Sequence, residues 1–148
     1  RDQRSFFKDI KIAYRENWVL QHTRALDACY MRAPFYEFYR DNLFSILTSQ
    51  EEYLMDLDRK LIQWVLNMLR ANLTISFTTS YQKEQTADFQ DGRNQLLPNQ
   101  AVLIQDQVHY AQVFEDRIGF QPNMSILDLL FCNGPSSASL LKDSNSRF

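Results

Sequence analysis

The segment from residue 51 to residue 70, EEYLMDLDRKLIQWVLNMLR, has the strongest hydrophobic periodicity in the chain. Its apolar side chains recur at steps of three and four residues, which is the spacing of one face of an α-helix. The opposite face carries charged and amide side chains. The pattern predicts a helix at 51–70 that packs its apolar face into a core, and this face consists of Leu54, Leu57, Leu61, Trp64 and Met68.

Two further helices are predicted upstream, at 18–33 and 35–47. Asn17 is a suitable N-cap for the first. Pro34 ends that helix, because the residue before a proline is disfavoured in the helical region. Proline is also favoured in the first turn of a helix, so the second helix starts at or directly after Pro34.

A histidine lies in the centre of the apolar stripe of the helix at 18–33. The opposite face is more polar and carries Leu20, Arg24, Asp27 and Met31. We therefore expect His22 to point inward, towards a core or a cleft. The apolar stripe consists of Trp18, His22, Ala25, Leu26, Cys29 and Ala33.

After residue 70 the period changes from 3.6 to two. Alternation over 73–81 predicts a half-buried strand. Its candidate partners are a short strand at 10–14 and the segment 107–114, since a single strand is not stable alone. Residues 82–100 have no period and indicate a long surface loop.

The C-terminal part contains one short helix with clear boundaries. Ser125 can cap its start, and Asn133 and Gly134 followed by a proline end it. Asp128 has two interpretations, as the capping-box partner of Ser125 or as a catalytic carboxylate. These patterns predict a single, predominantly helical α+β domain over 1–148, with three main helices, a short strand and a loop-rich C-terminal segment with one short helix.

Composition excludes several classes of function. With 45% hydrophobic residues, 148 residues suffice for one domain that buries about 70% of its unfolded surface. The net charge of -2, without a long run of like charge, gives no basis for binding nucleic acid. Only three glycines occur and none are clustered, which excludes the dinucleotide fingerprint and the P-loop.

The sequence also contains no membrane span, no signal peptide and no metal-site spacing. No apolar run approaches the roughly 18 residues of a membrane span, and no signal peptide opens the chain. Cys29 and Cys132 lie in apolar helical surroundings, which favours a reducing compartment and a cytoplasmic protein. The two cysteines and two histidines do not have a zinc-site spacing, so no metal site is expected, and no cofactor is identified.

One catalytic arrangement remains, a histidine beside a carboxylate. Asp9, Glu16 or Glu37 could each orient the imidazole of His22 as a general base near neutral pH. The alternative is a buried histidine satisfied by hydrogen bonds.

Three stretches of the chain resemble the WbqC-like family, bacterial proteins associated with O-antigen and other surface-polysaccharide gene clusters. The stretches are 9–39, 54–69 and 110–135. The chain has Thr23 where the family usually has a tryptophan. The family's N-terminal third has no counterpart in the sequence, so the resemblance leads us to expect a C-terminal portion of that domain. The resemblance implies modification of a sugar nucleotide or of O-antigen, with transfer of glycine or another acyl-type group.

Two functions of different classes follow. The first is an enzyme that acts on a sugar-nucleotide or polysaccharide precursor. This hypothesis predicts a cleft. Its catalytic residues are His22 and Asp9, and its substrate-binding residues are Trp18, Tyr30, Tyr110 and Gln112. The second is a non-catalytic interaction or structural protein of a polysaccharide-biosynthesis assembly. It predicts an aromatic patch for a homo-oligomer or another partner, formed by Phe35, Tyr36, Phe38 and Tyr39.

Overall fold

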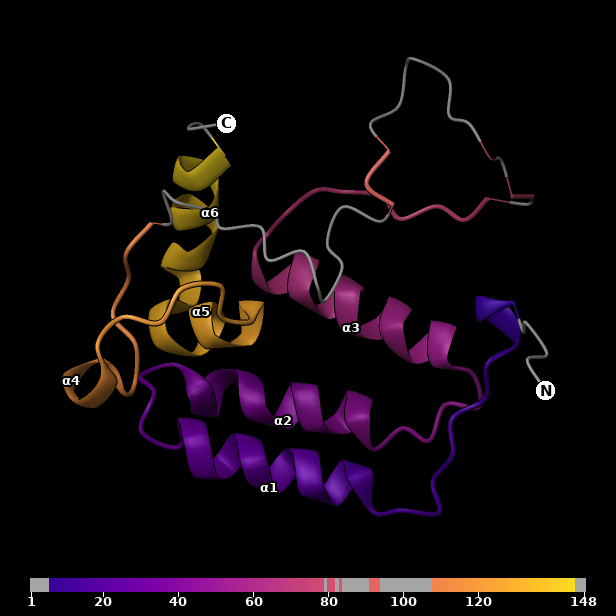
Figure 1. The fold of residues 1–148 in the computed structure, drawn as a ribbon, viewed down its shortest axis with the longest axis horizontal. Coiled ribbons are helices and arrows are strands. Elements are labelled where there is room, and N and C mark those ends of the chain that lie inside the picture. The colour runs from indigo at the N-terminus through magenta and orange to yellow at the C-terminus, as the bar shows by residue number, and fades with distance from the viewer. Residues whose placement is uncertain (1–5, 79, 82, 84–90, 94–107, 146–148) are drawn as a thin grey trace.

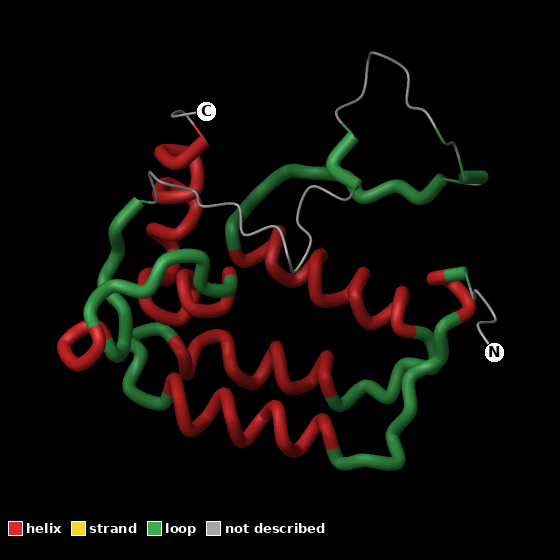
Figure 2. The backbone as a smooth tube through the Cα atoms, viewed as in Figure 1, coloured by secondary structure: helices red, strands yellow, loops and turns green. Residues whose placement is uncertain are grey.

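The computed structural model describes residues 6–78, 80–81, 83, 91–93 and 108–145, with side chains given as far as Lys142. Within these residues the fold is helical (Figures 1 and 2). The α-helices are α1 (Trp18–Tyr30), α2 (Tyr36–Leu47), α3 (Leu54–Met68), α4 (Glu115–Ile118), α5 (Ile126–Asn133) and α6 (Ser137–Asn145). Two short 3-10 helices, η1 (Phe7–Asp9) and η2 (Gly134–Ser136), complete the elements.

Helix α2 is the centre of the fold. It lies between α1 and α3, and α5 packs against its N-terminal part (Figure 1). The aromatic core forms at this junction, where the ring of Tyr36 meets that of Phe131 edge-on at 4.9 Å and Tyr39 meets Trp64 at 6.2 Å. Leu130 and Phe131 have no exposed surface, so α5 supplies the best-buried part of the core.

The three predicted main helices are confirmed, but α1 ends at Tyr30, before residue 33, and Asn17 makes no capping hydrogen bond with its side chain. Helix α3 starts at Leu54 and not at residue 51, because the residues before it pair with the N-terminal segment. Lys11 and Tyr53 form an isolated antiparallel bridge, and Ile12 N–H donates to the carbonyl of Glu52 at 2.9 Å. The predicted short strand at 10–14 is reduced to this bridge.

The predicted strand at 73–81 is not seen in the part of it that the structure describes. Residues 73–78 and 80–81 form no ladder with any described segment, and Leu73 and Phe77 are exposed. A strand without a partner has no stability of its own, so alternation alone does not create one. The described residues therefore contain helices without a sheet, and most of the predicted loop at 82–100 lies outside them.

The inward face of α1 differs from the predicted stripe by one position. Thr23 is its buried residue, and His22, Ala25 and Cys29 are exposed. Asp27, expected on the solvent side, faces α2. Both of its oxygens accept hydrogen bonds from Arg40, at 2.6 and 2.9 Å, and Oδ1 also accepts from the hydroxyl of Tyr36 at 2.8 Å.

This network explains why α1 is rotated about its axis by one residue relative to the predicted orientation. A carboxylate can face a neighbouring helix when its charge and hydrogen bonds are satisfied there. The guanidinium of Arg40 holds the pKa of Asp27 below its usual value, against the opposing effect of burial. Separately, none of the helices in the described ranges has the length and apolar character to span a membrane.

Candidate functional site

Three aromatic side chains form a row at the N-terminal end of α1, namely Tyr14, which precedes the helix, and Trp18 and His22 within it. Trp18 and His22 are four residues apart in the helix, so they fall on one face. Tyr14 stacks on Trp18 with ring centroids 5.8 Å apart, and His22 meets Trp18 edge-on at 5.5 Å. The hydroxyl of Tyr14 donates to the carbonyl of Glu51 at 2.9 Å, which anchors this aromatic row to the start of α3.

The imidazole of His22 is exposed but oriented. Its Nδ1 lies 2.7 Å from the carbonyl oxygen of Trp18. A carbonyl can only accept, so Nδ1 carries the proton in the neutral ring and Nε2 holds the lone pair. The prediction that His22 points inward is wrong, while this arrangement leaves Nε2 as a base at the surface.

The carboxylates predicted to orient His22 do not lie beside it. Among the described residues no carboxylate is within ion-pair distance of His22. Asp9 is exposed in η1, which packs against α3, and Glu16 and Glu37 are also exposed without an ion pair to this histidine. A catalytic role for Asp9 stays a prediction.

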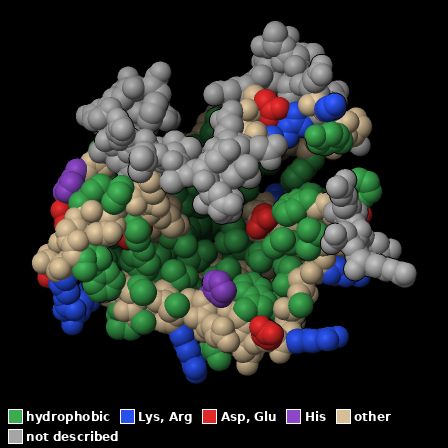
Figure 3. Space-filling model, viewed as in Figure 1, with side chains coloured by type: hydrophobic (Ala, Val, Ile, Leu, Met, Phe, Trp, Pro, Cys, Tyr) green, Lys and Arg blue, Asp and Glu red, His purple; other side chains and the backbone are tan. Residues whose placement is uncertain are grey.

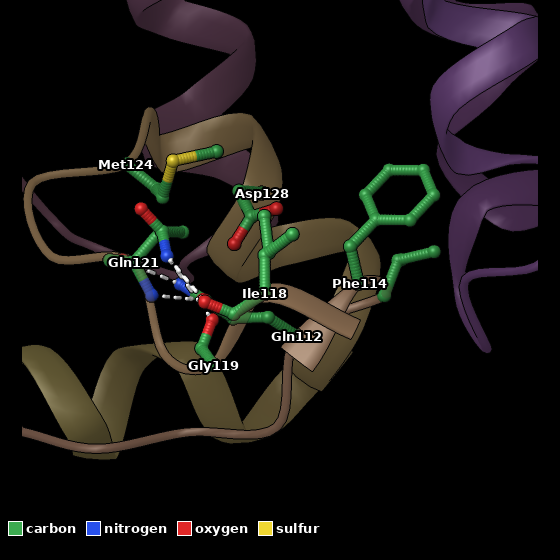
Figure 4. Close-up of a pocket in the computed structure, with 8 residues that line it drawn as sticks. Gln112, Phe114, Ile118, Gly119, Gln121, Met124 and Asp128 are labelled. Carbon is green, nitrogen blue, oxygen red and sulfur yellow. Dashed lines mark hydrogen bonds between the residues drawn. The ribbon is translucent and has the colours of Figure 1, made fainter. Parts of the chain in front are cut away.

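A second group of polar residues lies where the segment 108–125 meets α5. Here the structure has a small hollow with a cavity volume of about 40 Å³ (Figure 4). It is smaller than the roughly 300 to 1,000 Å³ of typical ligand pockets. Its lining residues are Gln112, Val113, Phe114, Ile118, Gly119, Gln121, Met124 and Asp128.

Asp128 lies in this hollow with only 3% of its surface exposed. Ser125 caps α5 as predicted, since its Oγ accepts from the backbone N–H of Leu127 at 3.2 Å. The carboxylate of Asp128 does not complete the capping box, and its Oδ2 accepts a hydrogen bond from the hydroxyl of Tyr110 at 2.8 Å. The capping-box interpretation of Asp128 is therefore wrong, and its interpretation as a catalytic carboxylate stays a prediction.

The charge of Asp128 reaches several neutral groups around it. Burial raises the pKa of Tyr110, and the carboxylate of Asp128 adds to this rise. The same two causes raise the pKa of Tyr30. Burial, with a further contribution from Asp128, raises the pKa of Cys132 to about 11. All three groups therefore stay protonated near neutral pH.

Gln112 holds the loop together. Its Nε2 donates to the carbonyl of Gln121 and its Oε1 accepts from the N–H of the same residue, both at 2.8 Å. The backbone N–H of Gln112 donates to Glu115 Oε2 at 3.1 Å. Both ends of the side-chain amide are used within the protein, which leaves it little capacity for a substrate.

A histidine and carboxylate pair that sequence analysis missed lies beside this loop. Nε2 of His109 is 3.0 Å from Oε1 of Glu115, and the His109 ring packs on Phe120 at 4.4 Å. His109 is largely exposed. His109 precedes α4 and Glu115 begins it, so no single helix or strand period relates the two residues, and the sequence held no signal for the pair. The sequence did contain a signal for the burial of Asp128, because the other five residues of the stretch ILDLLF are apolar.

The predicted substrate-binding residues divide into two groups. Trp18 begins α1 and Tyr30 ends it, so twelve residue steps of 1.5 Å place them about 18 Å apart. Trp18 belongs with His22, whereas Tyr30 and Tyr110 both lie near Asp128. The chain's two histidines likewise form separate purple patches in Figure 3.

The described residues contain no group of three potential metal ligands.

Comparison with known proteins gives one match. The family model described as the WbqC-like protein family matches residues 1–97. The match includes the stretches 9–39 and 54–69 and ends before 110–135, the third stretch with the predicted resemblance. No curated protein and no solved structure matches the chain.

Proposed function

Because the chain belongs to the WbqC-like protein family, we propose that it acts in the biosynthesis of O-antigen or another surface polysaccharide. In this proposal it transfers an acyl-type group to a sugar precursor, with His22 as the base. The observation that carries the proposal is the imidazole fixed by the Trp18 carbonyl, with a basic nitrogen beside an aromatic row.

The chemistry needs only what α1 offers. The apolar face of a sugar ring can pack on the half-buried indole of Trp18, as apolar groups do on aromatic rings. Nε2 of His22 accepts the proton from a sugar hydroxyl or amino group as that group attacks the carbonyl carbon of the donor. The leaving group then departs from this carbon with its electron pair. A backbone carbonyl, in place of a carboxylate, sets the orientation of the imidazole.

The test compares His22→Ala with Gln21→Ala, an alanine substitution at the adjacent exposed position of α1. Each variant replaces the wild-type protein in a polysaccharide-producing strain, and the acyl content of the polysaccharide is measured by mass spectrometry. We expect His22→Ala to abolish acylation and to change the free energy of unfolding by no more than about 0.5 kcal/mol, as for other surface substitutions. Gln21→Ala should retain both properties.

A second candidate is a non-catalytic interaction protein of the same pathway. It is favoured by the position of His22, which lies outside the hollow and without a carboxylate among the described residues. The aromatic patch predicted for it is wrong as a surface, because Tyr36 and Tyr39 are buried and Phe38 alone of the four is largely exposed. Full acylation of the polysaccharide by a stable His22→Ala variant would refute the role of His22 as the base. The interaction protein would then be the remaining candidate function.

A further inference from the structure

The carboxylate of Asp128 is buried without a cation beside it. It accepts a hydrogen bond from the neutral hydroxyl of Tyr110 and lies beside the neutral hydroxyl of Tyr30, and no lysine, arginine or histidine of the described residues is within ion-pair distance. A buried charge without a counter-charge is costly, and proteins normally pair such groups. Asp128 thus has an unmet preference for a positive charge.

The hollow in front of Asp128 gives access to this carboxylate. Figure 4 shows it among the side chains of Ile118, Gln121 and Met124. Phe114, Ile118 and Met124 are 41, 62 and 45% exposed and form an apolar rim. The Gln112 amide is bonded to Gln121, and the Nε2 of Gln121 donates to the carbonyls of Ile118 and Gly119. The acceptors that remain for a ligand are the carboxylate of Asp128 and the side-chain Oε1 of Gln121, and of these the carboxylate carries the charge.

We propose that this hollow binds a primary ammonium group carried on a short apolar chain, with the ammonium on Asp128 and the chain against the rim. An ammonium supplies both the missing positive charge and hydrogen-bond donors. A metal ion fits less well, because no second and third charged ligand accompany Asp128 in the described ranges. The small volume limits the ligand to a few carbon atoms beyond its ammonium.

One property of the surroundings supports a cation here. The raised pKa values of Tyr30, Tyr110 and Cys132 keep these groups neutral, so none of them competes as a second anion. The site is also independent of the proposed base, because Tyr30, near Asp128, and Trp18, beside His22, lie at opposite ends of α1. The two proposals can therefore fail separately.

The experiment titrates the full chain with propylammonium chloride and, separately, with 1-propanol, which has a similar apolar chain but no charge. Backbone amide signals are followed by NMR in phosphate buffer, since amine buffers would compete. We expect saturable shifts in residues 112–124 and 128–130 with propylammonium only, and no shift at His22. Equal shifts with 1-propanol, or no saturable shift with propylammonium, would overturn the proposal.

Variants assign the binding to Asp128. Asp128→Asn should weaken propylammonium binding about 10- to 100-fold, the worth of one charged hydrogen bond. Asp116→Asn makes the same change on the nearby exposed face of α4 and should bind like the wild type. Wild-type affinity in Asp128→Asn would refute the site.

The rim provides a test that does not alter the buried carboxylate. Ile118→Lys places a positive charge at the mouth of the hollow and should weaken propylammonium binding, whereas Ile118→Gln should retain most of it. Ile118 is largely exposed, so both variants should fold even if Asp128→Asn does not. Equal affinities of the two Ile118 variants would contradict binding of a cation in the hollow.

Discussion

Gly134, directly after α5, is the position where the smallest addition should damage the fold most. Its φ is +53° and its ψ is -128°, a conformation that glycine adopts and other residues rarely do. A methyl group added to it would lie 2.5 to 2.7 Å from three atoms of the Phe35 ring. The backbone that carries the ring is held in place, because the N–H of Phe35 donates to the carbonyl of Phe131 at 2.9 Å, and the half-buried ring packs against the core.

Gly134→Ala should therefore lower the free energy of unfolding by two separate effects. The strained backbone contributes about 1 to 3 kcal/mol. Displacement of the Phe35 ring within a packed core contributes about 1 to 3 kcal/mol more. The expected total is about 2 to 6 kcal/mol, measured by urea denaturation followed by circular dichroism.

Gly119→Ala is the matched control for the backbone effect. Gly119 has a φ of +72°, but nothing lies within 4 Å of an added methyl group. This variant should lose only the backbone contribution of about 1 to 3 kcal/mol. In a double-mutant cycle, Phe35→Ala should reduce the cost of Gly134→Ala by removing the clash. Equal costs of the two glycine substitutions, together with no coupling to Phe35, would refute the reasoning.

Two further substitutions test the core and the link between α1 and α2. Leu130→Ala should cost about 2 to 5 kcal/mol in a denaturant titration, because its side chain is fully buried. Asp27→Asn should cost about 1 kcal/mol at neutral pH, and Asp41→Asn, which removes an exposed carboxylate from the same Arg40, less than half of that. Because Arg40 lowers the pKa of Asp27, the stability from this pair is complete above the usual value of 3.8 and is lost as the pH falls through the lower folded pKa. The difference between wild type and Asp27→Asn should thus disappear in acid, and a difference independent of pH would contradict the ion pair.

The sequence was sufficient for the positions of the main helices but not for all of their faces. In α3 charged and amide side chains mark the face opposite the apolar stripe, so Leu57 and Trp64 are buried as the periodicity predicts. In α1 apolar residues occur on several sides, and a rotation by one residue gives an almost equally good stripe. The observed rotation depends on Arg40, thirteen positions beyond Asp27, which no pattern within the helix contains.

The candidate sites show the same limit. His22 was found because it is a rare residue type within a periodic helix, but its exposure followed from the face that α1 presents to α2. The predicted residues Tyr30 and Tyr110 meet near Asp128 because the chain folds back after residue 107. Such a contact between distant segments has no local signature.

Ser125 and Asp128 separate what local sequence decides from what packing decides. Both belong to one capping-box pattern, and Ser125 fulfils its half through a neighbour two residues away. Asp128 instead bonds Tyr110, eighteen residues away, and enters a surrounding of apolar side chains. A carboxylate that is buried without a counter-charge, where it could instead have capped the helix, lowers the stability of the fold. Positions at which the structure departs in this way from what the local sequence favours are expected to be functional. The hollow over Asp128 is therefore the place where we expect a ligand.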